Sequence, residues 1–319
     1  MPPTAPDLRI HILLREEEIA RDFAAALDRK FLDEKFFYWL PNSAQAWIDL
    51  CSSSAYRNAD RALGLLQRES ATLSELARGV ERHCGIGCGD GSKDAVLLKA
   101  FPRAPAYIGA DFSQTLLEIA VTRCAPLAGS ATGIKLDVFR DEHLSYLAKA
   151  GSAGSAGRGS SMYAVLGNTL GAFAPDQFPA RLRRIMQPSD WALLDGEIFA
   201  GEETLRGYDN PENRRFAFAP LASLGLEDER DGTLRFQQQV GEGGLHHVIK
   251  FFEASRSINF NIAGRRIQMA GGERLRMSSS IKYDEATFRR LLEAGGFAIR
   301  HFARSDDQRF VLAAVQPNK

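Results

Sequence analysis

The stretch HCGIGCGDGSKDAVLLK, residues 83–99, is the strongest indication of the fold of this chain. Glycine stands at four alternate positions within it (Gly85, Gly87, Gly89 and Gly91), and a helix-like pattern follows at once. Glycine lacks a Cβ atom, so a chain rich in it can turn sharply and approach a ligand closely. Such a turn between a strand and a helix is a common way to hold a nucleotide-like cofactor. The stretch therefore predicts a cofactor site, and the flanking sequence must indicate which cofactor it takes.

Strand-like and helix-like segments alternate after the glycine turn. The expected strands are residues 106–112, 133–139, 161–171 and 190–198, and the expected helices between them are 114–127, 142–151 and 178–187. This alternation is typical of a parallel sheet covered by helices on both faces. The small-residue stretch 151–160, GSAGSAGRGS, predicts a flexible loop before one strand.

The texture of the sequence changes beyond about residue 199. Residues 234–283 are dense in β-branched and aromatic residues with glycine turns, which is typical of antiparallel strands. The last 35 or so residues return to a helix followed by strands. The α/β sheet is therefore expected to be interrupted by a β-rich insertion and completed by the end of the chain.

Composition excludes several classes of function. The 319 residues contain 40 Lys plus Arg and 40 Asp plus Glu, and this neutral balance argues against nucleic acid as a partner. We see no secretory signal and no apolar run long enough for a membrane helix. Four cysteines suggest reduced thiols, and no His/Cys cluster predicts a metal. We expect a cytoplasmic protein, a monomer, with a small-molecule substrate and neither a membrane nor a metal.

Glycine spacing narrows the choice of cofactor. A dinucleotide fingerprint needs a third glycine at the sixth position, where counting from Gly87 gives Ser92. A phosphate loop needs Gly-Lys-Ser/Thr, and the order here is Gly-Ser-Lys. What remains is a Gly-x-Gly-x-Gly turn followed by two acids. Asp111, after the next strand, can accept hydrogen bonds from two ribose hydroxyls, and Asp137, after the third, can read an adenine amino group. This layout predicts a site for S-adenosylmethionine.

The sequence also resembles the histidine-specific methyltransferase family, whose members trimethylate the α-amino group of histidine. The resemblance runs from about residue 35 to 315 and rests on the order and spacing of five motifs. They are KFFYW (35–39) for the family's K-[WY]-F-Y-D, GCGDGSK (87–93) for G-S-G-T-S-E-K, VLGNTLGA (165–172) for FLGSTIGN, YDN (208–210) for Y-D-D, and SSIKY (279–283) for VSCKF.

The resemblance implies a class I methyltransferase, with a Rossmann-like seven-stranded sheet and a second α+β domain. The cofactor-binding core would be residues 61–195 and 284–319, and residues 1–60 and 196–283 would form the substrate-binding lid. The cofactor would be S-adenosylmethionine, leaving as S-adenosylhomocysteine. The residues implied to bind it are Gly87, Gly89, Lys93, Asp111, Asp137 and Val138. Tyr38 and Tyr208 match tyrosines that contact the substrate amino acid.

Several departures from the family pattern fall in the implied sites. The acid that opens the cofactor motif is Gly85 here, and the asparagine that grips the substrate amino acid is Ala172. The first tyrosine of the family's EYYPTR falls on Ala55, with Tyr56 beside it. The glutamate and serine that hold the imidazole fall on Ser278 and Ser280, which are alternate residues on an expected strand and so share a face. Histidine is therefore not the expected substrate, since polar partners of this kind dominate discrimination between similar substrates.

The sequence predicts methylation of a small amino-acid-like or amine metabolite, most simply on nitrogen. Such a transfer is an in-line displacement, so the protein must align a deprotonated amine and exclude water. Tyr38 could orient the nitrogen, and its proton could leave through Tyr208 or water. An oxygen, sulfur or carbon acceptor stays open, and so does a metabolite-binding protein that has kept the fold without turnover.

Overall fold

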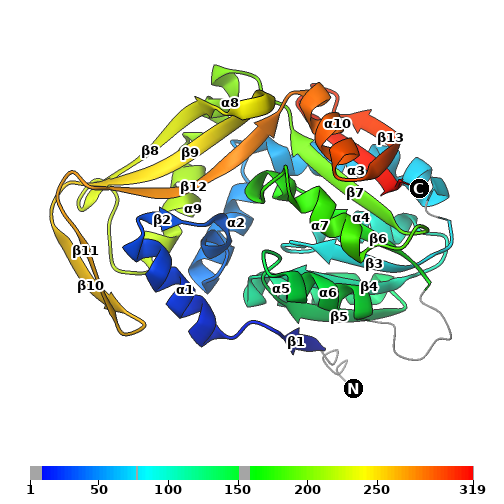
Figure 1. Cartoon of the computed structure of the whole chain (residues 1–319), viewed down its shortest axis with the longest axis horizontal. Coiled ribbons are helices and arrows are strands. Elements are labelled where there is room, and N and C mark those ends of the chain that lie inside the picture. The colour runs from blue at the N-terminus through cyan, green and yellow to red at the C-terminus, as the bar shows by residue number, and fades with distance from the viewer. Residues whose placement is uncertain (1–8, 77, 151–158, 319) are drawn as a thin grey trace. The chain divides into compact units, whose positions relative to one another are not determined.

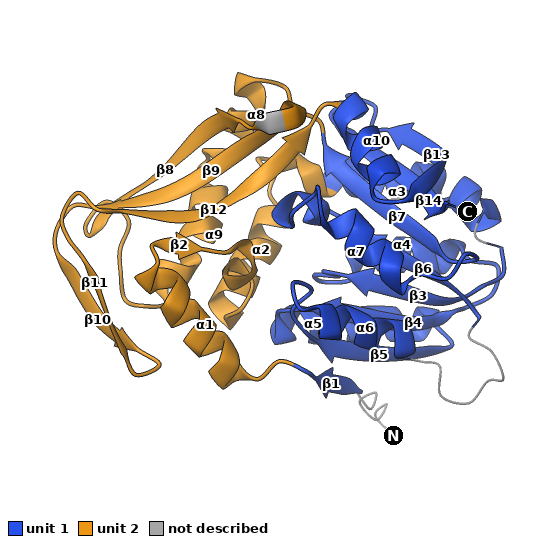
Figure 2. Ribbon diagram, viewed as in Figure 1, with its two compact units in different colours: residues 1–13, 60–197, 285–319 blue, residues 14–59, 198–284 orange. Residues whose placement is uncertain are grey.

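The structure is a computed structural model that describes residues 9–76, 78–150 and 159–318. It divides into two compact units, coloured separately in Figure 2. Unit 1 comprises residues 1–13, 60–197 and 285–319, and unit 2 comprises residues 14–59 and 198–284. Most of the expected loop, residues 151–158, lies outside the described residues.

Unit 1 is built on one sheet in the order β1-β5-β4-β3-β6-β7-β14-β13 (Figure 1). The strands are β1 (Ile10–Ile12), β3 (Val80–Ile86), β4 (Ala106–Asp111), β5 (Ser130–Lys135), β6 (Ser160–Val165), β7 (Trp191–Glu197), β13 (Phe297–Arg304) and β14 (Phe310–Pro317). All neighbours are parallel except β14, which is antiparallel to both β7 and β13. The mixed architecture is the α/β class that the sequence predicted.

The sheet has eight strands where seven were expected. The additional strand is β1, which pairs in parallel with β5 and places Ile10 opposite Gly133. Three residues are too few to show an alternating pattern, so this strand was not predictable from the hydrophobic pattern of the sequence. The pairing groups the start of the chain with unit 1, whereas the sequence analysis assigned residues 1–60 to the second domain.

Six helices flank this sheet. They are α3 (Arg57–Leu76), α4 (Ser92–Ala100), α5 (Gln114–Cys124), α6 (Asp141–Lys149), α7 (Phe178–Ile185) and α10 (Glu285–Ala294). Leu66 of α3 and Leu97 of α4 lie in one apolar cluster with Leu193 of β7, and α7 contacts both α6 and α10. Parallel crossovers are right-handed, so the helices before and after the turn back to β6 cover opposite faces.

The glycine turn lies at the topological switch point of the sheet. The chain proceeds from β3 to β4 to β5 and then returns to β6, on the other side of β3. Ligands of open α/β sheets bind outside the carboxyl ends of the strands at such a reversal. Residues 87–91 follow β3 directly, so the fold places them at this position.

Unit 2 contains a four-stranded sheet in the order β2-β12-β9-β8 and a separate hairpin of β10 and β11 (Figure 1). Its strands are β2 (Phe31–Leu32), β8 (Gly232–Val240), β9 (Leu245–Ala254), β10 (Ile258–Ile262), β11 (Arg265–Met269) and β12 (Arg274–Tyr283). Its helices are α1 (Glu16–Asp28), α2 (Pro41–Cys51), α8 (Glu202–Tyr208) and α9 (Pro211–Ala222). The pairing of β12 with β9 breaks register between Arg276 and Ser279.

Candidate active site

The glycine turn adopts a backbone that only glycine fits without strain. Gly87, Gly89 and Gly91 have φ angles of 62°, 54° and 73°. A Cβ on Gly87 would lie 2.7 Å from Cγ2 of Thr169, and one on Gly91 would lie 2.8 Å from Cα of Ala120. The turn therefore combines left-handed conformation with close packing, and α4 begins immediately after it.

Asp111 joins this turn to the next one along the sheet. Its Oδ2 accepts a hydrogen bond from the Gly89 N–H at 2.9 Å, and its Oδ1 accepts one from the Ser113 N–H at 2.8 Å. Burial raises the pKa of the Asp111 carboxyl, and these backbone hydrogen bonds partly offset that rise. The carboxylate thereby fixes the ends of β3 and β4 relative to each other.

Asp137 and Val138 follow β5, the next strand of the same sheet. Both are buried, and Oδ1 of Asp137 accepts a hydrogen bond from the Phe139 N–H at 2.9 Å. The Asp137 N–H donates to Nδ1 of His143 at 3.0 Å. The predicted cofactor residues thus follow three neighbouring strands at their carboxyl ends.

Lys93 lies beside the loop that follows β6. A Cβ on Gly167 would fall 2.7 Å from Cε of Lys93. Asp195 of β7 holds this loop, because its carboxylate accepts from the N–H groups of Gly167 at 2.6 Å and Asn168 at 2.7 Å. Burial raises the pKa of Asp195 to about 7, against the opposing effect of those hydrogen bonds and of Lys93. The sequence analysis missed Asp195, although an acid inside the apolar strand ALLDGEI is an available signal.

The missing acid at Gly85 has a structural explanation. A Cβ on Gly85 would lie 2.6 Å from Oδ2 of Asp94, so the Asp94 carboxylate fills that space. Asp94 is buried, with its Oδ1 2.6 Å from Nε2 of His83, and its Oδ2 accepts a hydrogen bond from the Tyr107 hydroxyl at 3.2 Å. A carboxylate therefore fills the space beside Gly85, and it belongs to a residue of α4 instead of β3.

The predicted acceptor tyrosines form one aromatic cluster in unit 2. The Trp47 ring lies 5.4 Å from that of Tyr38, 5.8 Å from that of Tyr56 and 5.3 Å from that of Phe216. Tyr56 extends the cluster to Tyr208, whose ring centroid is 6.4 Å away. We call these five rings the aromatic cluster. The sequence analysis did not single out Trp47 or Phe216.

The Tyr208 hydroxyl lies in a compact polar group. Nζ of Lys282 donates to it at 2.5 Å and to Oγ of Ser280 at 2.7 Å, and the two hydroxyl oxygens are 3.5 Å apart. Lys282 is fully buried. It follows Ser280 by two positions, which places both side chains on one face of β12. That spacing could have identified Lys282 from the sequence.

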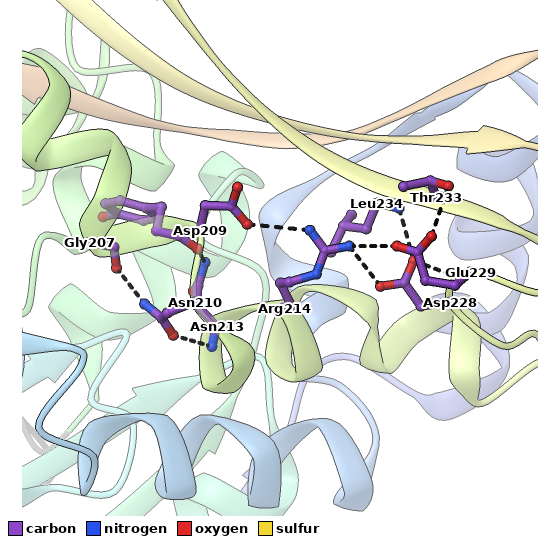
Figure 3. A network of polar contacts seen from close by, with 10 residues as sticks. Gly207, Asp209, Asn210, Asn213, Arg214, Asp228, Glu229, Thr233 and Leu234 are labelled. Carbon is purple, nitrogen blue, oxygen red and sulfur yellow. Dashed lines mark hydrogen bonds and ion pairs between the residues drawn. The ribbon is translucent and has the colours of Figure 1, made fainter.

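A network of polar contacts lies at the junction of α8 and α9 and includes Asp209, Asn210, Asn213 and Arg214 (Figure 3). The Asn213 side chain donates to the Tyr208 carbonyl at 2.5 Å, and Asn210 caps α9 by accepting from the Asn213 N–H at 2.9 Å. Arg214 pairs with Asp209 at 3.3 Å; it also pairs with Asp228 and Glu229 at the start of the β-rich segment, at 3.0 Å and 3.2 Å. The network anchors the end of α8, where Tyr208 lies.

Ser278 and Ser280 have different partners. Ser278 has a φ of 67° and falls where β12 and β9 lose register, so simple strand alternation does not describe the pair. The Ser278 hydroxyl donates to Oε2 of Glu34 at 2.5 Å, and Lys250 donates to both Glu34 oxygens. A carboxylate is therefore present beside Ser278 after all, supplied by a residue that the sequence analysis missed. Lys250 is buried as well.

Ala172 belongs to unit 1. It ends a short 3-10 turn, Thr169–Ala172, that follows β6 in unit 1, and it is half-buried. The other predicted acceptor residues, Tyr38, Tyr56, Tyr208, Ser278 and Ser280, all belong to unit 2.

Within residues 9–76, 78–150 and 159–318, no three His, Cys, Asp or Glu side chains come together as a metal site would require. In the same residues, no helix has the length and apolar character needed to cross a membrane.

Comparison with known proteins identifies the family. The sequence model of the histidine-specific, S-adenosylmethionine-dependent methyltransferases matches residues 17–317. The chain belongs to this family. It is therefore an S-adenosylmethionine-dependent methyltransferase with a Rossmann-like α/β core, as the sequence resemblance indicated. No functionally curated protein matches the chain.

Several solved methyltransferase structures are similar to this chain at low sequence identity. The CcbJ methyltransferase of Streptomyces caelestis is 12% identical, with a TM-score of 0.40 over 79% of this chain and 95% of that one. DesVI of Streptomyces venezuelae is 12% identical, with a TM-score of 0.41 over 88% and 100%. Magnesium protoporphyrin IX methyltransferase (ChlM) of Synechocystis PCC 6803, solved with bound SAM, is 11% identical, with a TM-score of 0.44 over 96% and 98%.

Proposed function

We propose that this methyltransferase transfers methyl groups to the amine nitrogen of a small amino-acid-like or amine metabolite other than histidine. The observation that carries the proposal is the group formed by Tyr208, Ser280 and Lys282 at the edge of the aromatic cluster. Phenol hydroxyls beside aromatic faces suit an amine, which needs a hydrogen-bond partner before methylation. The same faces attract the cation formed afterwards.

Division of the work between the two units is part of the proposal. In unit 1, Gly87, Gly89, Lys93, Asp111, Asp137 and Val138 would hold S-adenosylmethionine. The left-handed turn at Gly87 supports this assignment, because the absence of a Cβ lets a ligand approach its backbone. In unit 2, the residues that would hold the acceptor are Tyr38, Tyr56, Tyr208, Ser278 and Ser280.

The chemistry asks the protein for alignment and for a path for one proton. Bound S-adenosylmethionine supplies a methyl group on a sulfonium sulfur, and a protonated amine has no lone pair to receive it. Tyr38 orients the acceptor nitrogen. The Tyr208 hydroxyl gives its own proton to water, directly or through Ser280, and the phenolate oxygen then takes the proton of the amine. The buried Lys282 ammonium donates to the Tyr208 oxygen and stabilises negative charge that develops there.

An acceptor other than histidine follows from the residues around Ser278. A serine and an alanine (Ala172) replace the glutamate and asparagine that the family uses to hold histidine. The carboxylate that does lie beside Ser278 belongs to Glu34, and its charge is offset by Lys250. The hydrogen-bond pattern offered to an acceptor side chain is therefore different, and such differences dominate discrimination.

The test is methyl transfer from S-adenosylmethionine with a labelled methyl group to a panel of amino acids and simple amines. Mass spectrometry of the products locates the methyl group. We expect label on an amine nitrogen, and we expect Tyr208→Phe to lower kcat by about 10²-fold because proton transfer is impaired. Tyr146→Phe is the matched control, since Tyr146 lies in α6 of unit 1 and bonds His11. Label on oxygen, sulfur or carbon, or no labelled amine, would contradict the proposal.

A further inference from the structure

A buried ion pair lies next to the aromatic cluster. Nζ of Lys250 is 3.2 Å from Oε1 and 3.1 Å from Oε2 of Glu34, and the two side chains are 3% and 10% exposed. Burying two charges costs free energy that their attraction does not always return. A pair in this position therefore invites a functional explanation.

The backbone at Ser278 is arranged to join this pair. Ser278 adopts a left-handed φ of 67°, which is costly for a residue other than glycine, and it lies in a break of strand register. Such irregularities redirect side chains, and here the Ser278 hydroxyl donates to Oε2 of Glu34. The strain is thus associated with a specific polar arrangement.

Aromatic rings connect the pair to the proposed acceptor site. Nζ of Lys250 lies 4.3 Å from the centroid of the Phe37 ring and 5.8 Å from that of Phe216. Phe216 belongs to the aromatic cluster and lies 5.3 Å from Tyr38. A group bound among these rings would therefore meet the ion pair at its end.

Hydrogen-bond capacity indicates what that group is. An ammonium has three donors, and the contacts to Glu34 use two of them. A carboxylate has about four acceptor positions, and Lys250 and Ser278 use three. Among the contacts of the described residues, one donor of Lys250 and one acceptor position of Glu34 are thus unused, on a pair with no net charge.

We infer that Glu34, Lys250 and Ser278 form a subsite that recognises a neutral carboxamide on the methyl acceptor. The amide N–H₂ donates to Glu34 and the amide oxygen accepts from Lys250. An amide presents its donor and acceptor in nearly the same direction, whereas the two nitrogens of an imidazole point apart. A carboxylate would face Glu34 with like charge, and an ammonium would face Lys250. This inference rests on the proposed function and names the class of its substrate.

The test compares kcat/KM for methyl transfer to glutamine and asparagine with that for glutamate, aspartate, histidine and lysine. For the wild-type protein we expect the amides to exceed their isosteric acids by about tenfold or more, because the acids place like charges together. In Glu34→Gln the Lys250 charge is no longer offset, so the preference should shift toward glutamate and aspartate by at least about tenfold. Lys250→Met should lower transfer to the amides and raise relative transfer to lysine.

Controls separate this inference from the function on which it rests. Glu273→Gln also removes a lysine-paired carboxylate from unit 2, at the half-buried pair with Lys30, and should leave the selectivity unchanged. The double variant Glu34→Gln with Lys250→Met lacks both charges of this ion pair and should lose the preference between amide and acid. Amine methylation without amide preference, or with unchanged selectivity in Glu34→Gln, would overturn the inference and leave the proposed function standing. If no amine is methylated, both are contradicted.

Discussion

Gly87 combines two constraints of the glycine turn, a left-handed backbone and a close contact with a neighbouring side chain. Its φ of 62° is unfavourable for alanine, and a Cβ would meet the Thr169 methyl group at 2.7 Å. We predict that Gly87→Ala destabilises the protein by about 1–3 kcal/mol through backbone strain. The same change should weaken binding of S-adenosylhomocysteine by about tenfold or more, because 1.4 kcal/mol corresponds to tenfold. Urea unfolding and calorimetric titration measure the two effects.

Gly64 provides the matched control for this substitution. It lies within α3, and a Cβ there would meet nothing within 4 Å. Gly64→Ala should therefore stabilise the protein by about 1 kcal/mol through helix propensity and leave ligand binding unchanged. Equal effects at the two glycines would show that the turn has no special requirement.

At the scale of elements, Asp195 makes the loop after β6 sensitive to pH. Its pKa is raised to about 7 in the folded protein, while in the unfolded chain it lies near 4. Between about pH 4 and pH 7 the folded state thus holds a proton that the unfolded state has released. Its contribution to stability therefore falls as pH rises through this window, by at most about 1.4 kcal/mol per unit.

The variant Asp195→Asn should remove that part of the pH dependence. The difference in unfolding free energy, variant minus wild type, is predicted to increase from pH 5 to pH 8 in urea titrations. Asp176→Asn, at an exposed acid on the segment after β6, is the control for removing a carboxylate from this part of the chain. A pH-independent difference for Asp195→Asn would mean that this carboxyl titrates normally in the fold.

The junction of α8 and α9 should govern the acceptor reaction alone. Asn213→Ala removes the side-chain hydrogen bond to the Tyr208 carbonyl, so the proposed proton acceptor loses a support of its position. We predict a fall in kcat of about tenfold, corresponding to about 1.4 kcal/mol, with unchanged binding of S-adenosylhomocysteine. Asn42→Ala, on α2 of the same unit, is a control of the same chemical kind. Loss of cofactor binding in Asn213→Ala would contradict this separation.

Much of unit 1 was predictable because its signals are local. The alternation of apolar runs with helical patterns predicted the strands and helices after residue 83, and the glycine spacing predicted the turn. The edge strand β1 was not predictable, since three residues show no period. Asp94 was equally hidden, because its proximity to Gly85 depends on how α4 packs against β3.

Contacts among the proposed acceptor residues were not predictable from the sequence, because they join residues far apart along the chain. Tyr38 and Tyr208 were identified by resemblance, but the contact of Ser278 with Glu34 joins residues 244 positions apart. The left-handed conformation of Ser278 has no sequence signature, because such a conformation normally selects glycine or asparagine. Only the fold reveals that the Glu34 carboxylate lies beside Ser278.

For the whole molecule, we propose that the cofactor and the acceptor bind to different units, which are formed from interleaved segments of the chain. Tyr208→Phe, in unit 2, is predicted to abolish most methyl transfer while leaving the affinity for S-adenosylhomocysteine within about twofold, a difference below 0.5 kcal/mol. Calorimetry and the transfer assay on the same preparation measure both quantities. Parallel loss of both would mean that the two functions are not separable in this way.

The most direct measurement is calorimetric titration of the wild-type protein, Asp111→Ala and Asp28→Ala with S-adenosylhomocysteine. Asp111 holds the Gly89 N–H at the end of β4, whereas Asp28 is an exposed acid at the end of α1. We predict that the wild type and Asp28→Ala bind S-adenosylhomocysteine with micromolar affinity, corresponding to about 8 kcal/mol. We predict that Asp111→Ala loses this binding. A folded wild-type protein that does not bind, or an Asp111→Ala variant that binds equally well, would contradict the cofactor site described here.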